Sequence, residues 1–151
     1  MAGEVLQPVN KFILDTGIIL RYLWGIKRAA DLLEFLKSLG EIHTSTITYM
    51  EILVGLKPKE EKSLKLFFER VTPIHVDQDI SEKAATLIRK YKSIFGRDNP
   101  RRFPDAIIAA TAWQHKGTFV TLNKNQFSKT TINEFVVKVI DQDAKDWISL
   151  L

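Results

Sequence analysis

Short apolar runs alternate along the chain with longer segments in which apolar residues recur every three or four positions. The short runs are typical of buried strands, and the longer spacing is typical of helices that bury one face. The pattern predicts about five short strands, at residues 12–14, 41–45, 72–76, 118–122 and 135–140. It predicts helices at residues 16–24, 27–39, 46–56, 58–71, 81–95, 106–116 and 145–151. Because strands that alternate with helices build a mostly parallel sheet, we expect an α/β fold with helices on both faces.

Residues that favour helix ends set several of these boundaries. Thr16 can cap the first helix, Ser81 can cap the helix that follows it, and Pro58 suits a first helical position. In the helix at residues 27–39, helical spacing predicts that the inward side chains are Ala30, Leu33, Leu36 and Leu39.

Length and composition favour one globular domain over residues 1–151. A chain of 151 residues buries a real core but is short for two domains, and 45% hydrophobic with 26% charged residues is ordinary for a globular protein. No apolar run is long enough to span a bilayer, so we expect no membrane partner. Residues 1–10 lack the plan of a signal peptide and are predicted as a flexible extension. The expected location is cytoplasmic.

The residue types available restrict the metal chemistry. The chain has no cysteine, which excludes disulfides and thiolate zinc sites, and its three histidines show no ligand spacing. Any bound metal should therefore be a hard cation with oxygen ligands. The formal charge of +4 is compatible with a polyanionic partner but does not by itself argue for one.

Three acidic residues occupy related places in the predicted fold. Asp15 follows the first strand, Glu51 lies early in the helix after the second strand, and Asp105 opens the helix before residues 118–122. Strand ends and the helix starts that follow them meet at one edge of a parallel sheet. Because clustered carboxylates raise one another's pKa, a cation or a proton must sit among them. Mg²⁺ or Mn²⁺ suits such a cluster and supports phosphodiester hydrolysis.

Each acid also has a purely structural interpretation. Asp15 could cap a helix, and Asp105 could complement a helix dipole. Thr48 and Glu51 fit a capping box, in which the glutamate bonds back to a backbone N–H. For Asp105 the functional interpretation is favoured, because the apolar helix that it opens would make an unpaired charge costly.

Four segments resemble the signature segments of PIN-domain ribonucleases, in that family's order: residues 12–20, 45–55, 104–112 and 120–123. The match covers nearly the whole chain, and the size resembles that of VapC-type toxins of prokaryotic toxin–antitoxin pairs. The resemblance implies that Asp15, Glu51 and Asp105 are the catalytic and metal-binding acids, holding Mg²⁺ or Mn²⁺, with RNA as the substrate. Thr16, Thr121 and Asn123 would support the site.

One position departs from the family's pattern. Family members often carry a further acid in the last segment, where this chain has Asn123 and Gln126. Neither residue supplies a negative charge, which favours one well-held metal ion over two. A protein with the fold but weak metal binding, acting through a protein or RNA partner, therefore stays an alternative. A Mg²⁺-dependent phosphatase with Asp15 as its nucleophile is a second alternative.

Basic residues near these acids could contact RNA phosphates. The candidates are Arg97, Arg101 and Arg102 before Asp105, and Lys124 beside Asn123; a solvated loop explains the three arginines equally well. The resemblance also implies a homodimer and a small antitoxin protein as partners. Tyr22 and Trp24, near the end of the first helix, could supply a partner surface.

Overall fold

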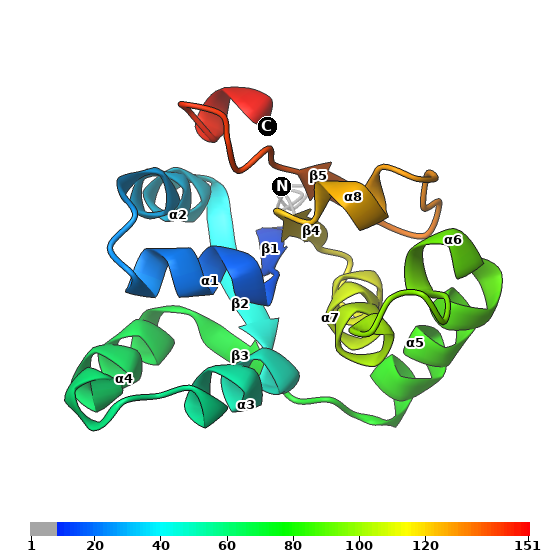
Figure 1. Cartoon of the computed structure of the whole chain (residues 1–151), viewed down its shortest axis with the longest axis horizontal. Coiled ribbons are helices and arrows are strands. Elements are labelled where there is room, and N and C mark those ends of the chain that lie inside the picture. The colour runs from blue at the N-terminus through cyan, green and yellow to red at the C-terminus, as the bar shows by residue number, and fades with distance from the viewer. Residues whose placement is uncertain (1–8) are drawn as a thin grey trace, which may run out of the picture.

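A five-stranded parallel sheet forms the centre of the computed structural model, which describes residues 9–151 (Figure 1). The strand order is β3-β2-β1-β4-β5, and every neighbouring pair runs parallel. The strands are β1 (Asn10–Leu14), β2 (Gly40–Ser45), β3 (Thr72–Ile74), β4 (Thr118–Thr121) and β5 (Val136–Val139). The predicted α/β fold is confirmed, with each strand close to its predicted place.

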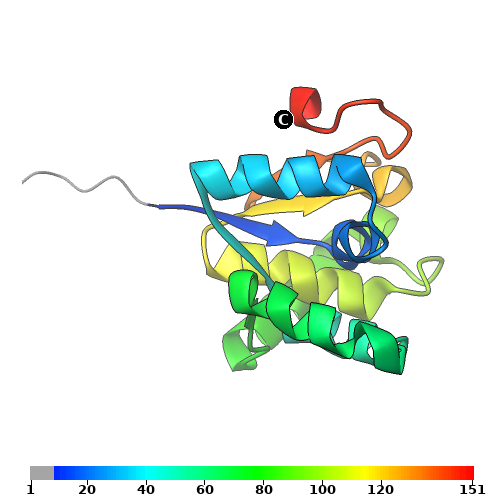
Figure 2. The same ribbon diagram turned by 90° about the vertical axis from the view of Figure 1, so that its left-hand side faces the viewer.

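Helices cover both faces of this sheet (Figures 1 and 2). They are α1 (Thr16–Leu23), α2 (Lys27–Leu39), α3 (Thr46–Val54), α4 (Glu61–Arg70), α5 (Gln78–Lys90), α6 (Lys92–Phe95), α7 (Arg102–Gln114) and α8 (Lys124–Phe127). Two short 3-10 helices, η1 (Pro58–Glu60) and η2 (Ile148–Leu150), complete the described elements. In residues 9–151 no helix is long and apolar enough to cross a membrane.

The alternation of side chains along the strands separates two cores. Ile13 and Phe119 point to the face covered by α5, α6 and α7. Their neighbours Leu14 and Val120 point to the other face, where α1, α2 and α4 pack. Because both faces are covered, the strands read as continuous apolar runs.

Two predicted helix caps are wrong. Asp15, which follows β1 in an extended conformation, caps α1 by accepting a hydrogen bond from the Thr16 N–H at 2.8 Å, so Thr16 is the first helical residue. Asp77 caps α5, accepting from the Ile80 N–H at 2.8 Å, and Ser81 lies inside that helix. In both cases the cap is an aspartate upstream of the predicted residue, and its carboxylate accepts a hydrogen bond from one of the unpaired N–H groups in the first turn of the helix.

The predicted helix at residues 81–95 is two helices. Tyr91, with a ψ of 65°, separates α5 from α6. Its hydroxyl donates to Glu134 Oε2 at 2.7 Å and accepts from the Asn133 N–H at 3.1 Å. These residues lie far along the chain, so apolar spacing could not predict the break.

Smaller differences occur at other elements. In α2 the buried side chains are Ala29, Leu32, Leu33 and Leu36, whereas Leu39 is 47% exposed. The predicted helix at residues 58–71 begins with η1, and the predicted closing helix is only η2. Helix α8 was not predicted, because four residues show no helical periodicity. Of the predicted extension, residues 1–8 lie outside the described residues, and Asn10 opens β1.

The parallel arrangement brings separate segments to one edge of the sheet. The strands β1, β2 and β4 end there, at Leu14, Ser45 and Thr121. Helix α7 leads back to the start of β4, so its first turn lies at the same edge. This edge carries the cavity described next.

Candidate functional site

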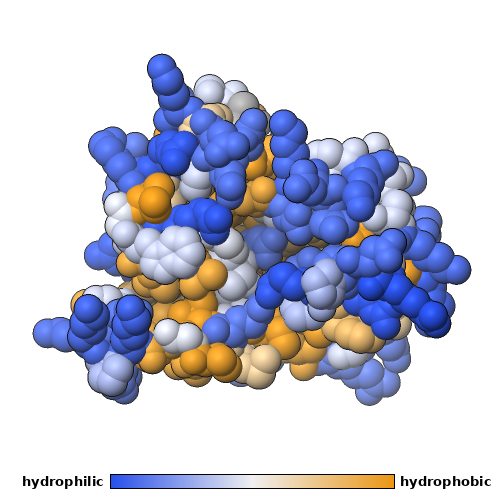
Figure 3. All heavy atoms as spheres, in the orientation of Figure 1, coloured by the Kyte–Doolittle hydropathy of each residue, from blue (hydrophilic) through white to orange (hydrophobic). Residues whose placement is uncertain are grey.

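A cavity of about 630 Å³ opens at the carboxyl edge of the strands. The predicted residues that line it are Asp15, Thr16, Glu51, Arg101, Asp105, Asn123 and Lys124. Asp141, Gln142 and Asp143, which follow β5, also line it. In the space-filling view hydrophilic side chains surround the middle of this face, and hydrophobic ones gather along its lower edge (Figure 3). The three predicted acids therefore share one polar cavity, as topology suggested.

Asp15 is held rigidly at the end of β1. Its Oδ1 accepts from the Thr16 N–H at 2.8 Å, and its Oδ2 accepts from the Thr121 hydroxyl at 2.7 Å. Its own N–H donates to the Val120 carbonyl at 2.9 Å, which ties it to β4. Burial raises the pKa of Asp15, and the bonds from Thr121 and Thr16 offset part of that rise.

Asp105, in the first turn of α7, is only 1% exposed. Its Oδ2 accepts from the Asn99 side-chain amide at 3.1 Å, and its Oδ1 lies 3.5 Å from Arg101 Nε. Burial, together with the negative charge of Asp15, raises the pKa of Asp105 to about 6. Two buried carboxyl groups that resist ionisation therefore face the same cavity.

Glu51 lies in the second turn of α3, and the capping-box interpretation of it is wrong. Ser45 caps that helix, and its hydroxyl accepts from the Ile47 N–H at 3.2 Å. Glu51 instead accepts from the Thr16 hydroxyl at 3.0 Å. It also forms a two-pronged ion pair with Arg101, with distances of 2.6 Å from Nη1 to Oε2 and 3.2 Å from Nη2 to Oε1. Glu51 thus points into the cavity and makes no capping bond to its own helix, whose cap is Ser45.

The donor chemistry of the cavity fits a hard divalent cation. Carboxylate oxygens are the ligands that Mg²⁺ and Mn²⁺ prefer, and a cation would relieve the cost of ionising Asp15 and Asp105. Within residues 9–151, however, no three acidic or histidine side chains lie close enough to hold one ion as they stand. The Glu51 carboxylate is instead paired with Arg101.

Thr121 at the end of β4 and Asn123 at the start of α8, both from the predicted segment at residues 120–123, lie beside the acids of this cavity. The Thr121 hydroxyl, fully buried, donates to Asp15 and accepts from the Asn123 N–H at 3.0 Å. The Asn123 side-chain oxygen caps α8, where it faces the Gln126 N–H at 3.4 Å. That oxygen therefore already has a role within the chain.

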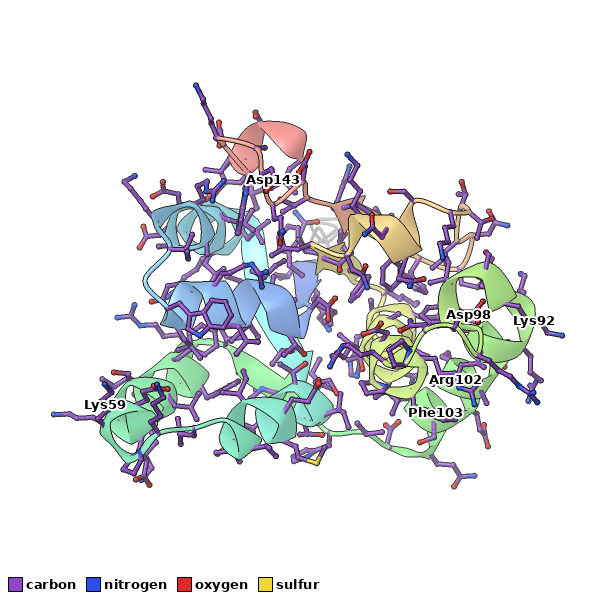
Figure 4. All side chains as sticks on the ribbon, viewed as in Figure 1. Lys59, Lys92, Asp98, Arg102, Phe103 and Asp143 are labelled. Atoms are coloured by element: carbon purple, nitrogen blue, oxygen red, sulfur yellow. The ribbon has the colours of Figure 1, made fainter. Side chains whose placement is uncertain are left out.

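The four basic candidates divide into two pairs. Arg101 and Lys124 line the cavity, and Lys124 Nζ lies 3.6 Å from Asp141. Arg97 and Arg102 are not among the lining residues. Arg102 instead stacks over Phe103, beyond α7 on the side away from α1 (Figure 4).

Asn99 is the site residue that the sequence did not reveal. It is 6% exposed and donates from its side chain to Asp105 and to the Ile94 carbonyl. Its side-chain oxygen accepts from the Arg101 N–H at 2.9 Å. Asn99 therefore holds both the carboxylate of Asp105 and the backbone of Arg101 in place. Beside Pro100 it looks like an ordinary turn residue, and only its burial distinguishes it.

Thr121→Val is expected to destabilise the protein by about 1–3 kcal/mol, because it leaves a buried carboxylate oxygen and a backbone N–H without a partner. Chemical denaturation measures the change. Thr111→Val is the matched control, since the buried Thr111 hydroxyl bonds only to a carbonyl of its own helix. Equal losses in the two variants would contradict this role of Thr121.

The chain resembles known proteins over most of its length. Its sequence matches the PIN domain family over residues 12–133. It is 33% identical over 117 residues to the ribonuclease VapC19 of Mycobacterium tuberculosis, covering 76% of this chain and 90% of that protein. A toxin–antitoxin complex from Klebsiella pneumoniae contains a chain 28% identical, with a TM-score of 0.65, covering 82% of this chain and 98% of that one. VapBC2 from Rickettsia felis, bound to a DNA fragment, shares the fold at 22% identity and a TM-score of 0.71, covering 87% and 99%.

Proposed function

This chain belongs to the PIN domain family, and on that premise we propose that it is a metal-dependent endoribonuclease, the toxin of a toxin–antitoxin pair. The observation that carries the proposal is the pair of buried carboxylates, Asp15 and Asp105, at one end of a polar cavity. Their ionised forms need a compensating cation there. The likeness to a ribonuclease supports RNA as the substrate.

In this proposal Asp15, Glu51 and Asp105 hold one Mg²⁺ or Mn²⁺ ion. When bound, the ion supplies an activated water and positive charge beside the phosphoryl oxygens. The chain's own residues position the acids: Thr121 and the Thr16 N–H hold Asp15, and Asn99 holds Asp105. Asn123 carries no charge, and its side-chain oxygen caps α8. Residues 120–123 therefore add no further acid to the cavity, which supports one ion over two.

Lys124 and Arg101 are the proposed contacts to RNA phosphates. Both line the cavity, and both side chains are partly exposed, so a phosphate at its mouth could reach them. Arg97 and Arg102, outside the lining, would contribute only through long-range attraction. The chain's net charge of +4 agrees with this assignment.

The deciding measurement is RNA cleavage with and without a divalent cation. We expect the purified protein to cut single-stranded or structured RNA when Mn²⁺ or Mg²⁺ is present and to lose at least about a hundredfold in rate in excess EDTA. Cleavage that continues unchanged in EDTA would overturn metal dependence. RNA binding without cleavage would favour the alternative binding protein, and hydrolysis of a phosphomonoester alone would favour a phosphatase.

A groove on the opposite side of α1 supports the proposed antitoxin partner. It lies between α1, α2 and α4 and is lined mainly by apolar side chains, among them Tyr22, Leu33 and Phe67. Tyr22 and Phe67 stack with ring centroids 5.1 Å apart. An apolar segment of a small antitoxin would fit such a groove.

Ala30→Glu, which places a charge at this groove, is expected to abolish copurification with the antitoxin while RNA cleavage by the isolated protein is retained. The test is coexpression with the product of an adjacent small reading frame, followed by a pull-down. Retained copurification would move the partner to another surface.

The predicted homodimer stays a proposal. The exposed apolar side chains of α3 offer a surface for it: Met50, Leu53 and Val54.

A further inference from the structure

Arg101 lines the cavity and contacts two of its three acids. Its Nη1 and Nη2 face the two carboxylate oxygens of Glu51 at 2.6 and 3.2 Å, and its Nε lies 3.5 Å from Asp105 Oδ1. Its positive charge also acts on Asp15. One guanidinium group thus partly neutralises all three acids.

Three hydrogen bonds hold the Glu51 carboxylate in this arrangement. Both of its oxygens face Arg101, and Oε1 also accepts from the Thr16 hydroxyl. The two-pronged contact and the positive charge of Arg101 therefore oppose the approach of a metal ion to this carboxylate beside Asp15 and Asp105. Arg101 therefore stands where a divalent cation would have to compete for Glu51.

The Arg101 side chain is exposed enough to move away from Glu51. The side chain of Arg101 is 46% exposed and that of Glu51 is 19% exposed, so water can replace the contacts that Arg101 gives up. The Arg101 backbone, in contrast, is fixed: its N–H donates to Asn99, and its carbonyl accepts from the Asp105 N–H at 2.9 Å. Rotation of the side chain alone would release Glu51 and leave the guanidinium at the mouth of the cavity.

We propose that Arg101 is an exchangeable counter-ion, which holds Glu51 in the metal-free protein and releases it when a divalent cation binds. This inference rests on the proposed metal-dependent function. Arg101 would thereby set the metal affinity of the site and become free to face an RNA phosphate only after the metal is bound.

The test is Mn²⁺ binding to the metal-free full-length protein, measured by calorimetry and by electron paramagnetic resonance without RNA. Arg101→Gln is expected to bind Mn²⁺ about tenfold more tightly than the unaltered protein, because the competing ion pair is gone. Arg101→Lys, which keeps the charge but loses the two-pronged contact, should fall between them. Arg102→Gln is the matched control: it removes the same charge from the neighbouring residue, outside the cavity lining, and should change the affinity less than twofold.

A second measurement separates exchange from a merely structural role. In the background of Glu51→Gln, Arg101→Gln should tighten Mn²⁺ binding much less, because the carboxylate for which the two cations compete is absent and only the charge effect of Arg101 on Asp15 and Asp105 remains. Circular dichroism checks that each variant is folded, and Arg101→Lys supplies the test if Arg101→Gln is not.

Equal or weaker Mn²⁺ binding by folded Arg101→Gln would overturn the exchange and leave the proposed nuclease function intact. If Arg101→Lys is the variant tested, binding no tighter than that of the unaltered protein has the same meaning. Tightening by Arg101→Gln that is equally large without the Glu51 carboxylate would also overturn the exchange at Glu51. Failure of every protein, the unaltered one included, to bind Mn²⁺ would overturn both the exchange and the metal-dependent function.

Discussion

Asp15→Asn is expected to lower the rate of RNA cleavage by about a thousandfold, the size of effect seen when a group that stabilises the transition state is removed. The amide has nearly the same shape and can still bond with Thr121, so the local structure should persist. What is lost is the negative charge at the end of β1. In the proposed mechanism, the cavity would then hold a divalent cation much more weakly and would lose the water that the cation activates.

The rate is measured with a fluorescent RNA at saturating Mn²⁺, beside a thermal unfolding curve for each variant. Asp98→Asn is the matched control, because Asp98 is an exposed aspartate outside the cavity lining (Figure 4) and its loss removes the same charge. The control should keep its activity. If Asp15→Asn cleaves RNA as fast as the control, the nuclease site is not at this cavity.

Asp105→Asn is expected to stabilise the metal-free protein at pH 7.5 while removing its activity. Burial and the neighbouring Asp15 raise the pKa of Asp105 to about 6 from an ordinary value of 3.8. A carboxyl group with a raised pKa binds its proton more tightly in the folded state, so it stabilises most below pH 3.8 and loses that contribution as the pH rises through 6. The ionised group then costs on the order of 3 kcal/mol of folding free energy at pH 7.5, which the asparagine avoids.

The pH dependence is the specific part of this prediction. In EDTA, the difference in unfolding free energy between Asp105→Asn and the unaltered protein should be largest at pH 7.5 and shrink toward pH 4. Asp98→Asn, at an exposed residue outside the cavity lining, is the control for the loss of one negative charge. A difference that does not depend on pH would mean that Asp105 ionises normally, with enough compensation from Arg101 and Asn99.

Stability and activity would then oppose each other at Asp105. The carboxylate that costs folding free energy in the metal-free protein is the one proposed to hold the cation. A residue that is unfavourable in the empty cavity is explained by what it binds. The same logic applies to Arg101, whose charge lies beside Glu51 and Asp105 and which is proposed to give way to the cation.

Local sequence was enough to find the acids and the fold. The apolar run before Asp15 and the helix after Asp105 are strong local signals, and a βα alternation has few other solutions than a parallel sheet. Because topology brings strand ends and helix starts to one edge, three acids far apart in sequence were expected in one place. All three line one cavity in the structure.

What the side chains bond to required the tertiary structure. Glu51 fits a capping box by spacing, but its partners are Thr16 and Arg101, which lie 35 and 50 residues away. Asn99 looked like a turn residue, and its burial against Asp105 depends on how α6 and α7 meet. At the break between α5 and α6, the Tyr91 hydroxyl likewise bonds to a residue distant in sequence, Glu134.

By itself, then, the sequence determined the layers of this protein and the edge at which its acids gather, because periodicity and residue type act locally. Only the tertiary structure decided that Arg101 faces inward while Arg97 and Arg102 do not line the cavity. The three arginines that precede Asp105 have the same chemistry and lie within six residues of one another. Which of them meets a carboxylate depends on the position of a helix fifty residues earlier in the chain.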